Sequence, residues 1–245
     1  MEKILEVTGL TKLYKNKRGV KDINFTIYKG EIFGFLGPNG AGKTTVMKAI
    51  TGLNRFDIGK VQILGNNLKE QFEKALRNVG AIIEKADVYE YMSAYNNLKL
   101  VARFYPDINE KEINEILDIV HLTEYKHEKA KNFSLGMKQR LALAMALLPK
   151  PALVILDEPT NGLDIEGIVE MRNLLKKLAK EQNITFFISS HQVHELELMC
   201  NRIAIIYKGN LINNGEEIKT IKDKYSSLEQ FYLNQIGGDL YNEQH

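Results

Sequence analysis

The sequence predicts an α/β protein whose parallel sheet is covered by helices on both faces. In the last third of the chain, short and fully apolar segments alternate with segments of helical periodicity. Strands of a parallel sheet are buried on both faces, so they lack the in-and-out alternation of half-exposed strands. The chain has 245 residues, 44% of them apolar, which is enough for a sizeable core in one or two compact units.

The first part of the chain is expected to be rich in strands. Residues 5–10 and 22–28 alternate between apolar and polar side chains, which predicts two half-exposed strands. Residues 31–36 form an apolar run that ends at a glycine-rich loop, as a buried strand would. After this loop, residues 44–53 have helical spacing, and residues 59–65 form a further strand between two glycines.

The middle of the chain is expected to be mostly helical. Residues 79–83 predict a short strand, and residues 93–105 and 109–122 then have apolar positions at helical spacing. Asn109 is a candidate helix cap, with Glu112 three residues later as its reciprocal partner. We therefore expect a helical insert at residues 84–133.

The last third alternates between helices and strands. Helices are expected at residues 136–148, 165–181 and 193–200, and strands at residues 152–156, 184–189 and 202–207. Pro149 and Pro151 end the first of these helices, and the polar tail is expected to form short helices. The whole chain, 1–245, is thus expected to be one domain, with a core of residues 1–83 and 134–213, the insert 84–133 and a tail at 214–245.

Composition excludes several classes of protein. The net charge of +2 argues against a protein that coats nucleic acid, and no nucleic-acid partner is expected. The single cysteine, Cys200, cannot form an internal disulfide and is expected to be a small core residue. Apolar runs fall far short of the roughly 20 residues that span a bilayer, and the start of the chain has no secretory signal. We expect a chain that stays inside the cell and reaches the membrane only through a partner.

A glycine-rich loop between a predicted strand and a predicted helix carries the first functional signal. Successive backbone N–H groups in such a loop, with the N-terminus of the helix, bind phosphate. Lys43 can reach the terminal phosphates, and the Thr44 hydroxyl can bind Mg²⁺. The alternative is a plain glycine turn, which the combined pattern disfavours. The predicted nucleotide-binding residues are Gly37, Pro38, Asn39, Gly40, Ala41, Gly42, Lys43, Thr44 and Thr45.

Two acids after a buried strand suggest the reaction. Residues 153–156 are apolar and lead directly into Asp157 and Glu158. The carboxyl ends of parallel strands are where α/β folds bind ligands, so Asp157 is a candidate Mg²⁺ ligand. Glu158 is a candidate general base that polarises an attacking water. A strand that ends in solvated charges is the plainer alternative, and the phosphate loop favours the catalytic interpretation.

Residues 133–140, Phe-Ser-Leu-Gly-Met-Lys-Gln-Arg, resemble the signature of the ATP-binding cassette (ABC) ATPases. That signature reads Leu-Ser-Gly-Gly-Gln followed by x-Gln-Arg, so Ser134, Gly136, Gln139 and Arg140 match it. Leu135 replaces a glycine, and neighbouring positions also depart from the pattern. The resemblance implies that Ser134 and Gly136, at a helix N-terminus, bind the γ-phosphate of ATP. By itself, Ser134 would be read as an ordinary helix cap.

Other positions of the chain match the same family. Tyr14 matches the aromatic residue on which adenine stacks. His191 matches the histidine that senses the γ-phosphate, so Lys43, Glu158 and His191 are the expected catalytic residues. Residues 161–164 resemble a loop that touches the opposite subunit. A loop tyrosine and a surface histidine are the plainer alternatives for Tyr14 and His191.

Glu84 is a departure from the family pattern. Most members have a glutamine there, which contacts Mg²⁺ and the reactive water and links the site to the membrane partner. The resemblance thus implies Thr44, Asp157 and Glu84 around the metal, with the Glu84 carboxylate adding negative charge. Together with the variant signature, Glu84 is similar to the bacitracin and lantibiotic resistance or immunity subfamily. The alternative is a neutral replacement.

The resemblance implies the fold and the working assembly. It implies a P-loop core with a parallel sheet, an N-terminal antiparallel β subdomain and a helical insert. It also implies a head-to-tail homodimer that binds ATP and Mg²⁺ between the subunits, joined to a transmembrane permease on the cytoplasmic face of the cell membrane. The expected task is ATP-driven removal of peptide antibiotics. The alternatives are a transporter for another substrate, a non-transport ABC ATPase, or a nucleotide sensor without catalysis.

Overall fold

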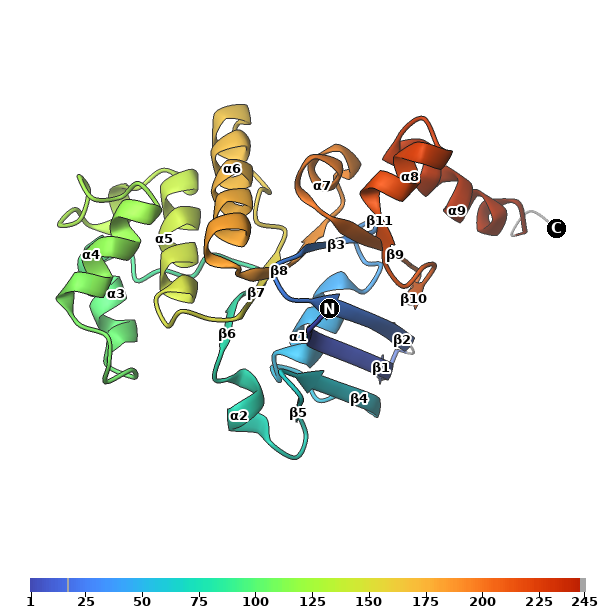
Figure 1. Cartoon of the computed structure of the whole chain (residues 1–245), viewed down its shortest axis with the longest axis horizontal. Helices are drawn as coiled ribbons and strands as arrows, with labels where there is room; N and C mark the ends of the chain where they lie inside the picture. The colour runs from blue at the N-terminus through green and yellow to red at the C-terminus, as the bar shows by residue number, and fades with distance from the viewer. Residues whose placement is uncertain (17, 243–245) are drawn as a thin grey trace.

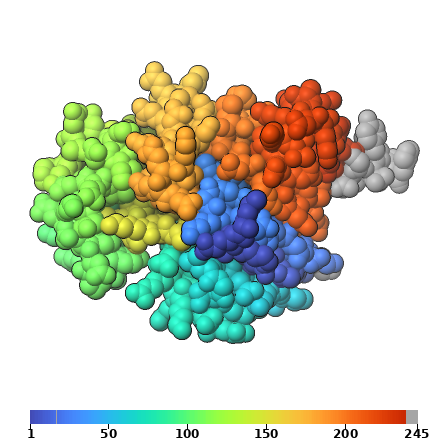
Figure 2. Space-filling view, viewed as in Figure 1, coloured from blue at the N-terminus to red at the C-terminus, as the bar shows by residue number. Residues whose placement is uncertain are grey.

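The computed structural model describes residues 1–16 and 18–242, with side chains up to residue 237. The described residues form two sheets, a small antiparallel one and a large, mainly parallel one, with helices packed around them (Figure 1). The predicted α/β class, with a parallel sheet and an antiparallel β region, is confirmed. Helices of the middle segment lie at one end of the long axis and the C-terminal helices lie at the other end (Figure 2).

The small sheet has the strand order β2-β1-β4-β5. Its strands are β2 (Gly19–Tyr28), β1 (Lys3–Leu13), β4 (Ile58–Ile63) and β5 (Asn66–Asn67). β1 extends three residues beyond the predicted strand, because the Leu13 amide donates to the Asp57 carboxylate at 2.8 Å and the Asp57 amide donates to the Thr11 carbonyl. These long-range bonds hold the end of β1 in a segment that local sequence did not predict as a strand.

The large sheet contains the apolar strands that the sequence predicted. Strands β9, β3, β8, β7 and β6 are mutually parallel, and β10 and β11 add antiparallel pairs at β9. The spatial order is β10 (Asn210–Leu211), β9 (Arg202–Tyr207), β3 (Ile32–Leu36), β8 (Thr185–Ser190), β7 (Leu153–Asp157) and β6 (Val79–Ile82), while β11 is Glu216–Glu217. Strand β3 lies between β8 and β9, so the sheet grows in both directions from it.

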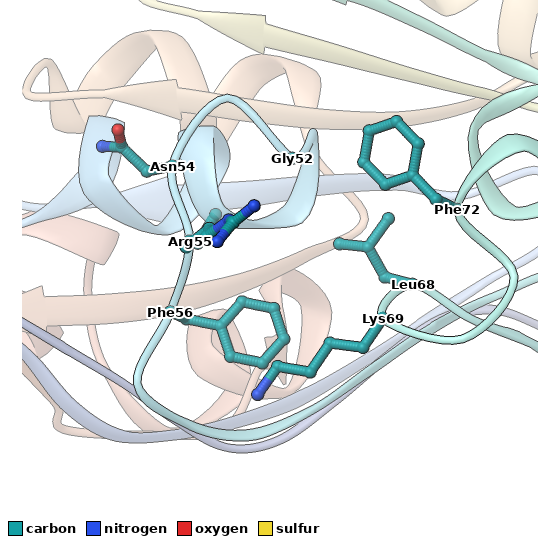
Figure 3. Close-up of a pocket in the computed structure, with 8 residues that line it drawn as sticks. Gly52, Asn54, Arg55, Phe56, Leu68, Lys69 and Phe72 are labelled. Atoms are coloured by element: carbon teal, nitrogen blue, oxygen red, sulfur yellow. The ribbon is translucent and has the colours of Figure 1, made fainter.

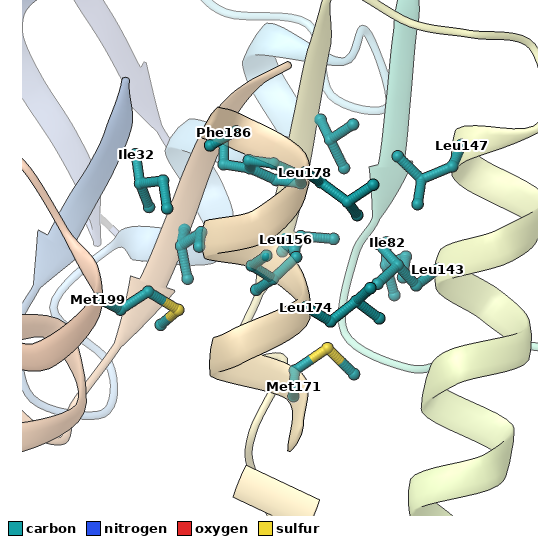
Figure 4. Packing of buried hydrophobic residues seen from close by; sticks show 14 of the residues in the cluster. Ile32, Ile82, Leu143, Leu147, Leu156, Met171, Leu174, Leu178, Phe186 and Met199 are labelled. Atoms are coloured by element: carbon teal, nitrogen blue, oxygen red, sulfur yellow. The ribbon is translucent and has the colours of Figure 1, made fainter. Parts of the chain in front are cut away.

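The large sheet is buried on both faces. Phe33 and Phe35 face the small sheet and helix α1 (Lys43–Ile50), where their rings pack against Phe25 and Phe187 at centroid distances of 5.4–6.0 Å. Alternate residues of the same strands, including Ile32, face the other core, beneath α5 (Leu135–Leu147), α6 (Ile165–Gln182) and α7 (Val193–Met199) (Figure 4). Burial on both faces explains why these strands are apolar throughout.

Residues between 84 and 133 form helices with short connections. Helix α3 (Ala94–Ala102) begins after Ser93, whose hydroxyl accepts from the Asn96 amide. Helix α4 (Glu110–Ile119) begins with the predicted reciprocal cap of Asn109 and Glu112. One turn of 3-10 helix, Ala130–Asn132, leads into α5. These helices pack against α5 through the larger core.

Three helices of the described ranges remain: one that was not predicted, between the two sheets in sequence, and two in the C-terminal tail. Helix α2 (Phe72–Leu76) is a single short turn that the sequence analysis did not anticipate, because five residues are too few to establish a period. The tail forms the expected helices, α8 (Ile218–Lys224) and α9 (Leu228–Asn242). No helix in the described part of the chain combines the length and the apolar composition that a bilayer span requires.

Candidate functional site

The carboxyl ends of three parallel strands meet at one edge of the large sheet. In the ladder, Leu36 of β3 pairs with Ser190 of β8, and Ser189 pairs with Asp157 of β7. The three strands therefore end side by side, and the loops that follow them begin at the same place. Ligands of open α/β sheets bind at this edge, where the chain changes direction across the sheet.

The loop after β3 has the backbone that phosphate binding requires. Gly42 lies just before α1 with φ +111°, and a Cβ on it would lie 2.4 Å from the Val20 Cγ1 atom. A Cβ on Gly37 would lie 2.3 Å from the carbonyl oxygen of Ile206. Both glycines are thus fixed by close packing, and α1 begins directly at Lys43 with its free N–H groups beside the loop.

Lys43 is buried against the loop and the acids. Its ammonium donates to the carbonyl oxygens of Gly37 at 2.7 Å and Pro38 at 3.2 Å, and it is 3.1 Å from Glu158 Oε1. Only 5% of the residue is exposed. The loop therefore holds one positive charge at its mouth, within reach of both a bound phosphate and the acid that follows β7.

Thr44 and Asp157 present oxygen atoms to the same point. The Thr44 hydroxyl donates to Asp157 Oδ2 at 2.7 Å, and the Ser189 hydroxyl donates to Asp157 Oδ1 at 2.6 Å. Mg²⁺ takes oxygen ligands at about 2.1 Å in octahedral geometry, which sets neighbouring ligand oxygens about 3 Å apart. The Thr44–Asp157 pair fits that spacing. No cluster of three or more His, Cys, Asp or Glu side chains converges in the described ranges, and Mg²⁺ needs none when phosphates and waters complete its shell.

Glu158 is held in an unusual backbone conformation. Its φ is +51°, a left-handed value that costs a non-glycine residue about 1–3 kcal/mol. The Glu158 amide donates to the hydroxyl of Ser189 at 3.0 Å and to its carbonyl at 3.2 Å, which fixes this turn. His191 Nδ1 shares a 2.8 Å hydrogen bond with Glu158 Oε2. The predicted trio of Lys43, Glu158 and His191 thus converges on one carboxylate.

Glu84 lies on the opposite wall of the same cleft. The cleft has a volume of about 620 Å³ and is lined by Thr44, Ile83, Glu84, Lys85, Asp87, Asp157, Glu158 and Asn161. Glu84 follows β6 with φ +67°, and its carboxylate forms an ion pair of 2.7 Å with Lys48 of α1. The three predicted metal-site residues therefore share one cleft, but the Glu84 carboxylate is bound to Lys48.

Ser134, Gly136 and Tyr14 lie away from this cleft. Ser134 caps α5, with its hydroxyl accepting from the Met137 amide at 3.2 Å, and a Cβ on Gly136 would lie 3.8 Å from the Leu163 Cδ2 atom. Tyr14 is 41% exposed, and its hydroxyl accepts from Asn54. None of the three lines the cleft. Ser134 and Gly136 could therefore bind a γ-phosphate only across a subunit interface. Tyr14 could stack on adenine only if the base lies outside the cleft.

A second hollow lies at the other end of α1. It has a volume of about 500 Å³ and is mostly apolar, with the rings of Phe56 and Phe72 and the side chains of Arg55 and Lys69 around it (Figure 3). No glycine loop and no carboxylate lines it. It has two cationic side chains but neither the phosphate loop nor an acid to hold a metal ion, so the cleft at the sheet edge is the better candidate for the nucleotide site.

Two residues of the site were not predicted. Ser189 positions both acids, as its hydroxyl bonds Asp157 and the Glu158 amide. Lys48 pairs with Glu84. The position of Ser189 at the end of an apolar strand was a usable signal, because adjacent parallel strands bring their ends together. No sequence signal points to the pairing of Lys48 with a residue 36 positions away.

Comparison with known proteins agrees with this geometry. Residues 20–161, more than half of the chain, match the family model described as "ABC transporter". The bacitracin transport ATP-binding protein BcrA of Bacillus licheniformis is 44% identical over 231 residues, covering 94% of this chain and 76% of that protein. The lantibiotic transport ATP-binding protein SrtF of Streptococcus pyogenes is 39% identical, covering 95% of this chain and 97% of that protein.

A solved structure shows the same fold. It is a dimeric, post-hydrolysis state of the ATP-binding cassette MJ0796, bound to ADP and Pi. It superposes with a TM-score of 0.77 at 24% identity, over 88% of this chain and 99% of that chain. The glycine loop, the paired acids and these matches lead to one conclusion: this chain belongs to the ABC transporter family, as an ATP-binding subunit that hydrolyses ATP.

Proposed function

We propose that this chain drives the removal of peptide antibiotics of the bacitracin or lantibiotic type from a bacterial membrane, as the ATPase of a transporter. One observation carries the ATPase part of the proposal. Glu158 forms an ion pair with Lys43 and a hydrogen bond with His191, next to the Thr44–Asp157 oxygen pair. The substrate part is supported by the relatives named for bacitracin and lantibiotic transport.

In this mechanism each polar group has a separate task. Lys43 and the loop amides bind the β- and γ-phosphates. Thr44 and Asp157 would hold Mg²⁺, which would neutralise charge on those phosphates. Glu158 accepts the proton of the attacking water. His191, within 2.8 Å of Glu158 Oε2, orients that carboxylate and contacts the γ-phosphate. The bonds of Ser189 to Asp157 and to the Glu158 amide keep both acids in place before ATP binds.

The proposal includes a head-to-tail homodimer. Ser134 and Gly136 begin helix α5, so the N–H groups of its first turn are available to an anion. They do not line the cleft that contains Thr44 and Asp157. A second copy of the chain would bring its own Ser134 to the γ-phosphate held by the first copy. The solved cassette of the same fold is dimeric, which supports this arrangement.

A membrane permease is the second proposed partner, and it places the chain on the cytoplasmic face of the membrane. A groove of about 510 Å³ runs beside Leu53, β6 and helix α5. Tyr89 and Tyr91, which follow Glu84 closely, are exposed to 45% and 67%. Exposed aromatic residues are typical of protein interfaces, and the groove offers a partner both apolar side chains and the charges of Lys85 and Asp87.

The test uses cells that carry the gene. Deleting it should sensitise the cells to bacitracin or to a lantibiotic, and the wild-type chain should restore resistance while a Glu158→Gln chain does not. Sensitivity to an antibiotic that acts on the ribosome serves as the control and should not change. If sensitivity to both peptides is unaltered while the purified chain retains ATPase activity, peptide antibiotics are rejected as the substrate. The assignment as an ATPase would still stand.

A further inference from the structure

Helix α1 carries two polar side chains on one face. Thr44 and Lys48 are four positions apart, so they lie one above the other, separated by about 6 Å along the axis. The Thr44 hydroxyl bonds Asp157 at 2.7 Å. The Lys48 ammonium forms an ion pair with Glu84 at 2.7 Å. One face of α1 therefore bonds to two carboxylates. Thr44 bonds Asp157 beside the proposed metal site, and Lys48 pairs with Glu84 one helical turn away.

Glu84 has the chemistry of a metal ligand and the freedom to become one. It lines the same cleft as Thr44 and Asp157, and its side chain is 59% exposed. No other ion pair or hydrogen bond of its carboxylate is found in the described part of the chain. A divalent cation at Thr44 and Asp157 would attract this carboxylate, and the ion pair with Lys48 opposes that movement.

We propose that Lys48 is a positioning residue that keeps the Glu84 carboxylate out of the magnesium shell. The ion pair neutralises the extra charge of Glu84 and leaves one metal position to water or phosphate. With Lys48 present, Thr44 and Asp157 are the protein ligands. Without Lys48, the carboxylate turns towards the cation and becomes a third one. The inference rests on the proposed roles of Thr44 and Asp157 at the metal.

The test measures metal binding separately from catalysis. The purified chain is loaded with the non-hydrolysable analogue β,γ-imido-ATP and titrated with Mn²⁺, which is followed by its EPR spectrum. Lys48→Met should tighten Mn²⁺ binding by about fivefold when Glu84 is present, which is the most that an exposed ion pair can withhold from the metal. In a Glu84→Gln background the same substitution should change it by no more than about twofold, because only the screened field of an exposed charge is removed.

The spectrum supplies an independent readout. Entry of the Glu84 carboxylate should displace one water from Mn²⁺ in Lys48→Met, as counted in D₂O, and Lys48→Arg should restore the wild-type count. An equal effect of Lys48→Met in both backgrounds, or an unchanged water count, would overturn the proposal.

Two controls separate this inference from the proposed function. Lys222→Met breaks an exposed ion pair of 3.0 Å with Glu197, on helices α8 and α7, and should leave Mn²⁺ binding unchanged. Thr44→Val should weaken Mn²⁺ binding in every background. If Thr44→Val has no effect, the metal site itself is misplaced, and this result rejects the proposed function as well as the role of Lys48.

Discussion

The two walls of the candidate cleft are built in different ways. On the strand wall, Asp157 and Glu158 line the cleft at the end of β7, and hydrogen bonds of 2.6–3.2 Å tie them to Ser189 and His191 at the end of β8. The loop wall begins at Glu84, after β6, and its acid is held by one ion pair with Lys48. Only 20% of the Glu158 side chain is exposed, against 59% for Glu84.

Both walls contain an acid in the left-handed region, with φ +51° at Glu158 and φ +67° at Glu84. Such a conformation persists only where the surroundings fix it. Ser189 fixes Glu158 through two bonds, whereas a single exposed ion pair is worth about 0–1 kcal/mol. The difference suggests that the strand wall is preorganised for chemistry, while the loop wall can move with the helices that follow it.

Of the substitutions in the two walls, we expect the one at Glu158 to have the largest effect on kcat. Glu158→Gln should lower kcat by about 10²–10⁴-fold, because the general base is lost, and it should leave ATP binding nearly unchanged. Steady-state phosphate release and ATP binding measure the two quantities. Glu166→Gln, in the first turn of α6, is the matched control and should keep the normal rate. A Glu158→Gln chain with the normal rate would remove Glu158 from the role of base.

A large effect is also expected at the mouth of the loop. Lys43→Ala should weaken ATP binding by at least about 100-fold, since a buried ammonium that can bond two phosphates is removed. Calorimetric titration with ATP measures the loss, and circular dichroism confirms that the variant is folded. Tight binding by Lys43→Ala would reject the loop as the phosphate site.

Ser189 tests how much of the strand wall is preorganised. Ser189→Ala leaves Asp157 without one donor and the Glu158 amide without one acceptor, so it should cost about 1–3 kcal/mol of stability. It should also lower kcat by about tenfold, because both acids lose their orientation. Urea denaturation and ATPase assays measure the two effects.

Ser190→Ala is the matched control for Ser189→Ala. It removes a buried hydroxyl of the same strand, which accepts from the Gln192 amide. It should destabilise the chain comparably and lower kcat much less. Equal losses of kcat in the two variants would mean that Ser189 acts only through stability.

The loop wall should show the smallest effect on the isolated chain. Glu84→Gln removes an exposed ion pair, so it should change the free energy of unfolding by less than about 1 kcal/mol and ATP binding by less than about threefold. Its effect should appear in coupling, as altered peptide resistance of cells with normal ATP binding by the purified chain. Unchanged resistance would show that the Gln-to-Glu departure is neutral.

The sequence was sufficient to predict the features that depend on a local pattern of residues. The buried strands β3, β7 and β8 were predicted within a residue or two, because a short, fully apolar run between two helices is typical of a parallel strand. The glycine loop, Asp157 and Glu158 followed from their place after these strands. Asn109 and Glu112 formed the expected reciprocal cap, since that motif depends only on residues three apart.

Contacts between distant segments could not be predicted in this way. Ser189 and Asp157 are 32 positions apart, and their bond depends on the register of two parallel strands. The extension of β1 to Leu13 depends on Asp57, 44 positions away. Lys48 and Glu84 meet because α1 passes beside the end of β6, a relation that no periodicity encodes. The roles assigned to the site residues, Tyr14, Ser134 and Gly136 among them, stay predictions.

The packing of β3 against Cys200 has a practical consequence. A Cβ at Gly34 would lie 2.8 Å from the Cys200 sulfur, so the thiol fills the space that this glycine leaves in the core. Burial also raises the pKa of the Cys200 thiol, which suppresses the thiolate that reacts with maleimides. Because the chain has no other cysteine, its natural form already serves as an unreactive background for site-directed labelling. A cysteine introduced at either wall of the cleft would carry a fluorophore or spin label selectively, and probe distances could then follow each wall through the ATP cycle.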